Sequence, residues 1–398
     1  MAGDTIEVRV DGIAGGGEGV GRDGGGRVVF VAGALPGERV RAEVVEERPR
    51  HARARLLDVV QASPDRRPPP CPHVADGCGG CDWQHVADGA QRALRREVVA
   101  DALARIGGLA DPVVTAGPAL PAAAARTTVR AVVAGGRAGF RRRGSHHPIV
   151  VGSCLASHPA AEELLVEGRF GGADEVVVRV GARTGERMVL ASPTAEGVAV
   201  PGDVLVVGAD ELAAGRRAWI HEEAAGRRWR VSARSFFQTS PEGADALVVA
   251  VGAAVGELAP RARSVVDLCA GVGLFAGTVA PDGAQVVAVE PSASAVADAR
   301  HNLADRDVRL VRSRLDRWRP SRADVVVADP PRAGLGRAGV DRVVSTGADT
   351  VVLVSCDPGA LGRDVGLLVA AGYRWEGSEA LDLFPQTSHV EVVSRFRR

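Results

Sequence analysis

The sequence contains no lysine, so all 49 of its basic residues are arginine, and 49 acidic residues balance them. A formal net charge of zero gives no overall field that would attract nucleic acid, so any RNA contact must come from local basic patches. The chain is also rich in alanine, glycine and valine, and we interpret the absence of lysine as a codon-composition bias. Arginine content alone therefore predicts no nucleic-acid binding.

Long apolar runs are absent as well. No stretch of uncharged apolar residues approaches the length of a membrane span, and the N-terminus has no basic region followed by an apolar core. We therefore expect a cytoplasmic protein without membrane contact, and we expect a monomer. Cysteine is scarce, with six residues, and in the cytoplasm cysteines serve as metal ligands or in catalysis more often than in disulfides.

The length of 398 residues favours about two or three domains. Residues 1–62 alternate apolar and polar at period two between glycine-rich turns, which predicts a small antiparallel β-barrel of the OB-like kind. Such barrels often bind oligonucleotides. A group of arginines in this segment could contact phosphates or could equally face solvent on an edge strand; it consists of Arg48, Arg50, Arg53 and Arg55.

The proline-rich residues 63–70 cannot form a helix or a central strand, so they mark a boundary. We expect a strand-rich central domain over residues 63–230. It includes a helix over about residues 87–106 that could pack on the domain that follows. Over residues 231–398 strands and helices alternate, which predicts a doubly wound, Rossmann-like α/β domain with a parallel sheet.

A nucleotide-cofactor site is predicted where the apolar run ending in Asp267 and Leu268 leads into a glycine-rich turn. Gly271 and Gly273 would let the backbone turn sharply toward a ligand. Glu290, at the end of the next apolar run, could accept hydrogen bonds from ribose hydroxyls. The same spacing fits the dinucleotide fingerprint, so this motif does not by itself distinguish S-adenosylmethionine from NAD.

Three later apolar runs deliver reactive groups at their ends, where open α/β sheets place their chemistry. The first ends in Asp329-Pro-Pro-Arg332, the second in the thiol of Cys356, and Ser388-His-Val-Glu391 supplies a second carboxylate. Each has an ordinary explanation taken alone, as a buried cysteine or an Asp-Pro turn. A hydride-transfer enzyme has no use for the combination, which therefore favours S-adenosylmethionine at the glycine motif.

A group of cysteines indicates a metal centre. Cys71, Cys78 and Cys81 lie close together in sequence, and Cys154 follows much later, after a run of arginines. Four thiolates suit either a [4Fe-4S] cluster or a structural zinc ion. Zinc ribbons usually present two Cys-x2-Cys pairs and this chain has one, so we favour iron–sulfur. The spacing does not establish that Cys154 belongs to the group.

These residues resemble a known family, the S-adenosylmethionine-dependent RNA uracil-5-methyltransferases, and specifically the 23S ribosomal RNA type with an N-terminal TRAM domain. The resemblance covers nearly the whole chain and rests on several motifs in the family's order. They are Gly17-Glu-Gly-Val-Gly21, Leu35-Pro-Gly-Glu-Arg39, Cys78-Gly-Gly-Cys-Asp-Trp-Gln-His85, Ser235-Phe-Phe-Gln238, Asp329-Pro-Pro-Arg332, Val354-Ser-Cys-Asp-Pro358 and Phe384-Pro-Gln-Thr-Ser-His-Val-Glu391.

The resemblance implies a TRAM β-barrel, a central domain with a [4Fe-4S] cluster and a catalytic methyltransferase domain. It implies that Cys356 is the nucleophile and Glu391 the base. The residues implied at the cofactor are Gln238, Glu290 and Asp329, beside Asp267, Gly271 and Gly273 of the glycine motif, and those implied at the cluster are Cys71, Cys78, Cys81 and Cys154. The chain departs from the family at Cys269, where an aromatic is usual, and at Asp357, where asparagine is common.

The implied chemistry is addition of a thiolate to carbon 6 of uracil, which makes carbon 5 nucleophilic enough to take the methyl group. A positioned base must then remove the carbon 5 proton before the thiolate leaves. The sequence offers no neighbouring histidine or lysine that would ionise the thiol. The target base must be flipped out or single-stranded, and the candidate stacking partners are Trp83, Phe236, Phe237 and Phe384.

Several alternatives stay open at this point. A transfer RNA uridine-5-methyltransferase or an RNA cytosine-5-methyltransferase would use the same chemistry. A non-catalytic RNA-binding iron–sulfur protein would need neither Cys356 nor Glu391, and the presence of both favours an enzyme. A nicotinamide oxidoreductase would use the cluster for electron transfer, whereas we expect a structural role for it. The preference for 23S ribosomal RNA rests on the family analogy.

Overall fold

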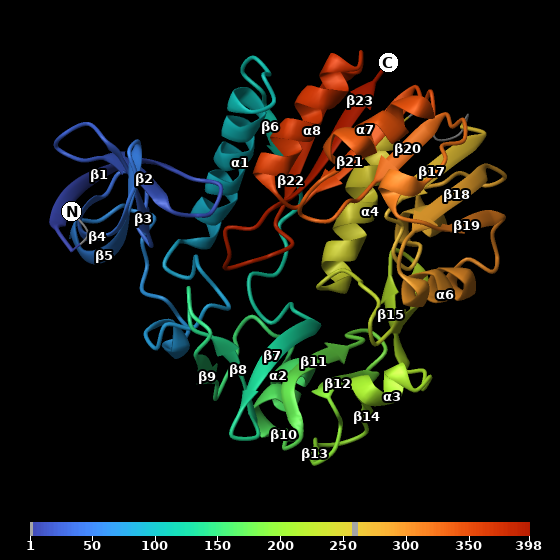
Figure 1. Cartoon of the computed structure of the whole chain (residues 1–398), viewed down its shortest axis with the longest axis horizontal. Helices are drawn as coiled ribbons and strands as arrows, with labels where there is room; N and C mark the ends of the chain where they lie inside the picture. Colours follow the sequence, from blue (N-terminus) through green and yellow to red (C-terminus); the bar gives the residue numbers. More distant parts are fainter. Residues whose placement is uncertain (1–2, 257–261) are drawn as a thin grey trace.

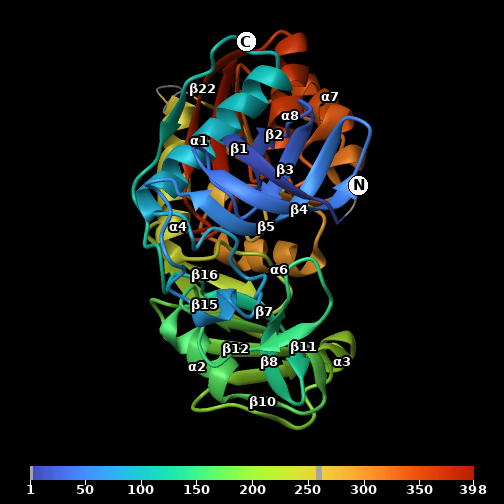
Figure 2. The same cartoon turned by 90° about the vertical axis from the view of Figure 1, so that its left-hand side faces the viewer.

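The computed structural model describes residues 3–256 and 262–398. Figure 1 shows a barrel that carries the N-terminus, a strand-rich central region, and an α/β region that carries the C-terminus. In the view of Figure 2 the barrel lies in front of the α/β region, close to helix α1 (Asp88–Arg105), and the central region extends to one end of the molecule. No helix within the described residues is long and apolar enough to cross a membrane.

The N-terminal region forms the barrel predicted from period-two alternation, but the barrel is not wholly antiparallel as predicted, because β3 and β5 pair in parallel. Its strands close in the order β1, β2, β3, β5, β4. Val8 and Val31 are among the valines that fill the interior, because successive side chains of a strand point to opposite faces. The connector that follows is anchored to the barrel by an ion pair between Arg66 and the buried Glu38. The strands are β1 (Thr5–Ile13), β2 (Gly19–Arg22), β3 (Val28–Ala32), β4 (Arg39–Glu47) and β5 (His51–Gln61).

The central region is built around a six-stranded sheet in the order β14, β12, β11, β7, β8, β9, with α2 in the same apolar core. A loop with the short helix η1 (Pro72–Val74) joins this region to the barrel. The elements are β7 (Thr128–Ala134), β8 (Arg137–Arg141), β9 (Pro148–Val150), α2 (Pro159–Glu167), β10 (Arg169–Phe170), β11 (Ala173–Val180), β12 (Arg187–Pro193), β13 (Val198–Ala199), β14 (Leu205–Gly208) and α3 (Ala209–Ala213).

The C-terminal region contains an eight-stranded sheet in the order β19, β18, β17, β20, β21, β23, β22, β6. Its first five strands are parallel, whereas β23 runs antiparallel to both of its neighbours. The strands are β6 (Val114–Ala116), β17 (Ser264–Leu268), β18 (Gln285–Glu290), β19 (Val308–Arg312), β20 (Val325–Ala328), β21 (Thr350–Ser355), β22 (Arg374–Leu381) and β23 (Glu391–Arg397).

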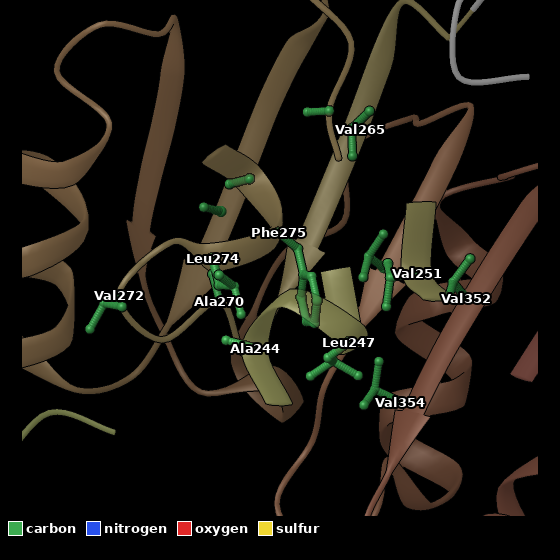
Figure 3. Packing of buried hydrophobic residues seen from close by; sticks show 14 of the residues in the cluster. Ala244, Leu247, Val251, Val265, Ala270, Val272, Leu274, Phe275, Val352 and Val354 are labelled. Atoms are coloured by element: carbon green, nitrogen blue, oxygen red, sulfur yellow. The ribbon is translucent and has the colours of Figure 1, made fainter. Parts of the chain in front are cut away.

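Helices cover both faces of this sheet, as a doubly wound fold requires. One apolar core includes α4 and α5, and Figure 3 shows Phe275 of α5 pointing toward Leu247 of α4. The other core joins α1, α7 and α8. The helices are α4 (Pro241–Val255), α5 (Leu274–Thr278), α6 (Ala293–Asn302), η3 (Leu315–Arg317), α7 (Gly336–Ser345) and α8 (Pro358–Ala370), and a hairpin of β15 (Trp219–Ala224) and β16 (Arg227–Ser232) precedes them.

Residues from the predicted central domain complete the catalytic sheet. Helix α1 packs on α8, and β6 pairs in parallel with β22 at the sheet edge. The expected packing of a helix over about residues 87–106 is therefore confirmed. The prediction of one continuous central domain over residues 63–230 missed that α1 and β6 belong to the α/β layer, because a strand as short as Val114–Ala116 leaves no clear periodicity.

Candidate active site

The strand register brings three predicted residues to one edge of the catalytic sheet. Asp329 and Cys356 directly follow the parallel strands β20 and β21. Strand β23 runs the other way and pairs Val392 with Ser355, so its first residue, Glu391, lies beside Cys356. The carboxyl ends of parallel strands and the amino end of their antiparallel neighbour thus meet at a single place.

Burial and negative charge dominate the electrostatics of this edge. Burial, together with the nearby carboxylates of Glu391 and Asp329, raises the pKa of the Cys356 thiol to about 11, while Arg332 opposes the shift. Burial and the charge of Asp329 also raise the pKa of Glu391 well above its ordinary value. Burial raises the pKa of Asp329 to about 7. At neutral pH the thiol therefore keeps its proton in the free protein.

One feature that favours the thiolate lies directly after Cys356. Asp357 is the N-cap of α8, and its Oδ1 accepts a hydrogen bond of 2.8 Å from the backbone N–H of Ala360, while Pro358 occupies the first helical position. The positive end of a helix favours a nearby anion. The Asp-Pro pair that follows Cys356 is a recognisable start signal for this helix in the sequence. The helix N-terminus lowers the pKa of the thiol less than burial and the two carboxylates raise it.

The glycine motif forms one wall of a pocket. Gly271 and Gly273 have positive φ angles of 55° and 97°, which turn the chain from β17 into α5. Gly271 donates its N–H to Oε2 of Glu290 at 3.0 Å. The pocket lies between this turn and the segment before α4; its lining includes Phe236, Gln238, Cys269, Gly271, Leu274 and Asp329.

The remaining predicted cofactor residues support the turn from behind. Asp267 is fully buried, and its Oδ2 accepts a hydrogen bond of 2.9 Å from the N–H of Ala276. Its other oxygen has no hydrogen-bond partner among the described residues. Burial raises the pKa of Asp267 to about 7, and the charges of Asp329 and Glu290 add to the shift. Glu290 is also occupied on its second oxygen by the N–H of Ser292 at 2.8 Å.

The cysteine group converges as predicted, including its distant member. Cys71, Cys78, Cys81 and Cys154 line one pocket beside Arg126 and Phe140. All are free thiols. Burial and the neighbouring thiols of the group raise the pKa values of Cys71 and Cys78.

The histidine in this pocket has other partners. His73 accepts the N–H of Gly152 on Nε2 and contacts Asp76 through Nδ1. Within residues 3–256 and 262–398, no group of three or more His, Cys, Asp or Glu side chains is arranged to hold a metal ion. The four cysteines thus share a pocket but form no preformed coordination shell among the described residues, and the metal centre stays a prediction.

A large open cleft is lined by residues of all three regions, with about 1660 Å³ of empty space that includes open solvent. The barrel contributes Gly17 and Arg53, the central region contributes Arg126 and Arg143, and the catalytic region contributes Phe384 and His389. Of the arginine group predicted on the barrel, Arg53 lines the cleft, where it forms an ion pair with Glu18, whereas Arg48 and Arg55 form ion pairs with Glu46 and Glu43 on the barrel surface. Neither alternative for this arginine group, contact with phosphates or exposure to solvent on an edge strand, thus applies to all of its members.

Burial separates the four candidate stacking residues. Trp83 and Phe237 are buried in apolar cores, the usual place for such aromatics, and present no exposed ring to a base, although Phe237 also lines the cofactor pocket. Phe384 lines the cleft, with His389 edge-on to its ring at 6.0 Å. Phe236 is 64% exposed beside the cofactor pocket. Sequence pattern does not separate these cases, because a core aromatic and a ligand-binding one have the same local signature.

Known proteins share both the domains and the fold. Residues 1–57 match the TRAM domain, and residues 242–346 match the methyltransferase small domain. A Streptomyces avermitilis protein named as an uncharacterized RNA methyltransferase is 40% identical over 98% of this chain and 98% of its own. The 23S rRNA (uracil(1939)-C(5))-methyltransferase RlmD of Chromohalobacter salexigens is 35% identical over 96% of this chain and 87% of its own.

A solved structure gives the same overall fold. The tRNA (uracil-54, C5)-methyltransferase of Pyrococcus abyssi, in complex with S-adenosyl-L-homocysteine, superimposes with a TM-score of 0.77 over 98% of this chain and 100% of its own, at 24% identity. The alignments with the two sequence relatives cover most of this chain and most of each relative. The chain therefore belongs to the family of S-adenosylmethionine-dependent RNA uracil-5-methyltransferases that carry an N-terminal TRAM domain.

Proposed function

We propose that this protein transfers the methyl group of S-adenosylmethionine to carbon 5 of a uridine in 23S ribosomal RNA. The observation that carries the proposal is the placement of Cys356 beside Glu391, at the sheet edge where Asp329 joins the cofactor pocket to the reacting groups. The choice of 23S RNA rests on the relatives named for that substrate. A transfer RNA substrate is the second candidate, supported only by the fold shared with the Pyrococcus abyssi enzyme.

The cofactor pocket suits a cationic, nucleoside-bearing molecule. S-adenosylmethionine would supply the methyl group on a positively charged sulfur. Gln238 and the backbone of Gly271 line the pocket with polar groups, and Asp329 adds a carboxylate. The unpartnered oxygen of Asp267 and the carboxylate of Glu290 place further negative charge behind the turn. A cation bound here would lower the raised pKa values of Asp267 and Asp329, because it favours their charged forms.

Cys356 would act as the nucleophile on carbon 6, and the addition makes carbon 5 an enolate carbon that would attack the methyl group, so that the sulfur–methyl bond breaks and S-adenosylhomocysteine leaves. The thiol must lose its proton first, which its pKa of about 11 opposes in the free protein. Glu391 would then remove the carbon 5 proton. The C–H electron pair forms the ring double bond as the sulfur leaves carbon 6. A carboxyl group whose pKa is raised by burial is a stronger base than an exposed one, which suits this step.

The test is nucleoside mass spectrometry on separated 23S, 16S and transfer RNA after incubation with the protein and methyl-labelled S-adenosylmethionine. We expect labelled 5-methyluridine in 23S RNA and none with Cys356→Ala, while binding of S-adenosylmethionine to that variant shows that it is folded. Label in transfer RNA or in 5-methylcytidine would change the substrate. No label in any RNA would refute the proposal and support a non-catalytic RNA-binding protein.

We further propose that Cys71, Cys78, Cys81 and Cys154 hold a [4Fe-4S] cluster. The shared pocket of four thiols supports this, because four cysteine thiolates are the ligand set of such a cluster. Such a group would clamp the loop between the barrel and the central sheet. After anaerobic purification we expect iron and sulfide to be lost in Cys154→Ala and retained in Cys269→Ala. An iron-free, folded and active wild-type protein would overturn the assignment.

A further inference from the structure

The segment over residues 384–390 carries the chain directly into Glu391 and has no regular secondary structure. Gln386, a non-glycine residue, has a φ angle of +64°. Such a conformation costs on the order of 1 kcal/mol or more and persists only where the surroundings hold it. Within the segment, Thr387 hydrogen-bonds the carbonyl of Phe384 through its N–H and its hydroxyl. The conformation therefore depends strongly on contacts from elsewhere.

Three of those contacts come from the loop that follows Cys81, a cysteine of the metal pocket. Asp82, which follows Cys81, accepts two hydrogen bonds from Ser388, at 3.0 Å from its N–H and at 2.6 Å from its hydroxyl. The N–H of Trp83 donates to the carbonyl of Gln386 at 3.0 Å. Trp83 in turn donates its indole N–H to the carbonyl of Gly17 in the barrel at 3.1 Å.

Helix α1 holds the same segment from the other side. Arg95, which is 2% exposed, donates to the carbonyl of Thr387 at 2.7 Å and forms an ion pair with Asp382. Its guanidinium also lies 5.5 Å from the ring of Trp83. Three parts of the chain that are distant in sequence thus meet at residues 384–390, just before the proposed base.

The place of Asp82 argues against a direct role in RNA binding. Its side chain borders the cleft lined by Arg53, Arg126 and Arg143. A carboxylate on such a wall would repel phosphate groups, so its presence there calls for another explanation. Its two hydrogen bonds to Ser388 provide one, because a charged acceptor makes short and strong bonds.

We propose that Asp82 and Ser388 are positioning residues for the removal of the carbon 5 proton, holding residues 384–390 so that Glu391 faces the adduct on Cys356. The inference rests on the proposed function, since it assigns the base to Glu391. Loss of the link should leave thiolate addition and methyl transfer in place and slow the proton removal that releases the product. The methylated RNA should then stay covalently bound to Cys356 for longer.

The test compares Asp82→Asn and Ser388→Ala with matched controls on the same sheet. At the opposite edge Asp324 accepts the N–H groups of Arg263 and Ser264 at 2.7 and 2.9 Å, and the hydroxyl oxygen of Ser264 accepts the N–H of Asp324 at 3.0 Å. Asp324→Asn and Ser264→Ala therefore perturb comparable hydrogen bonds far from the site. Covalent protein–RNA complex is quantified on denaturing gels with labelled RNA, beside kcat and KM for RNA and for S-adenosylmethionine. Glu391→Gln serves as the standard for a trapped adduct.

We expect both variants to accumulate adduct and to lose about tenfold or more in kcat, because a misplacement near 1 Å commonly costs that much. KM for RNA should stay nearly constant, and the controls should behave as wild type. A rise in KM for RNA without trapped adduct would overturn the inference and make Asp82 an RNA-binding residue. Unchanged kinetics would also overturn the inference. Ser388→Ala decides the matter if Asp82→Asn does not fold. A wild-type protein that labels no RNA would instead refute the proposed function itself.

Discussion

The contact between helices α1 and α8 offers a quantitative test of the packing that supports the active site. A Cβ at Gly362 of α8 would lie 2.6 Å from the carbonyl oxygen of Ala102 in α1 and 2.9 Å from the Cβ of Ile106. One of these atoms belongs to the backbone and the other is a Cβ atom, so neither can rotate away like the end of a long side chain. Gly362→Ala must therefore push the two helices apart.

The expected effect is the difference of two opposing terms. Alanine in place of glycine in a helix stabilises by about 1 kcal/mol, whereas overpacking of this kind costs about 1–3 kcal/mol. We therefore expect a net loss of up to about 2 kcal/mol in the free energy of unfolding. In a domain of this size about 1 kcal/mol shifts the melting temperature by roughly 2–4 °C.

A glycine in another helix provides the matched control. At Gly252 in α4 an added Cβ would meet no heavy atom within 4 Å. Gly252→Ala therefore gains the helix stabilisation of alanine without a steric clash. Thermal unfolding followed by circular dichroism should show a lower melting temperature for Gly362→Ala and an equal or higher one for Gly252→Ala. Because α1 carries Arg95, Gly362→Ala should also lower the rate of methylation. If both variants raise the melting temperature equally, the tight contact between α1 and α8 is refuted.

Three further predictions follow from charge and burial. The folded-state pKa of Asp267, at about 7, lies above its ordinary value, so the stabilisation from the held proton is full below about pH 4 and is lost as the pH rises through about 7. Melting temperatures of apo wild type should fall across that window more steeply than those of Asp267→Asn, and equal slopes would contradict the shift. Alkylation of Cys356 by iodoacetamide, followed by mass spectrometry, should be slow at pH 7 and should accelerate up to the alkaline range, because the pKa of this thiol is about 11. A rate that is already maximal at pH 7 would show a thiolate in the free protein. Arg53→Gln on the cleft wall should weaken RNA binding and reduce its salt dependence by roughly one phosphate contact. Arg41→Gln, which removes an exposed ion pair with Asp58 elsewhere on the barrel, should leave that slope unchanged.

Local patterns in the sequence predicted those features whose conformation depends mainly on neighbouring residues in the chain. The glycine turn after Leu268 follows from the need for positive φ angles between a strand and a helix, and the structure places them at Gly271 and Gly273. The barrel follows from alternation at period two, because only one face of each strand meets its core. Cys356 at a strand end follows from the apolar run before it. The family itself was recognisable from motifs of this kind.

Tertiary structure alone decided which of these groups meet. Glu391 lies beside Cys356 because β23 inserts antiparallel between β21 and β22, and its register depends on pairing partners far away in sequence. Cys154 joins the cysteine pocket, and Trp83 and Phe237 leave the set of stacking residues, because burial depends on packing between distant segments. The link from Asp82 to Ser388 spans 306 residues of sequence. The sequence thus determined which chemistry was present, whereas long-range pairing and packing determined which residues act together.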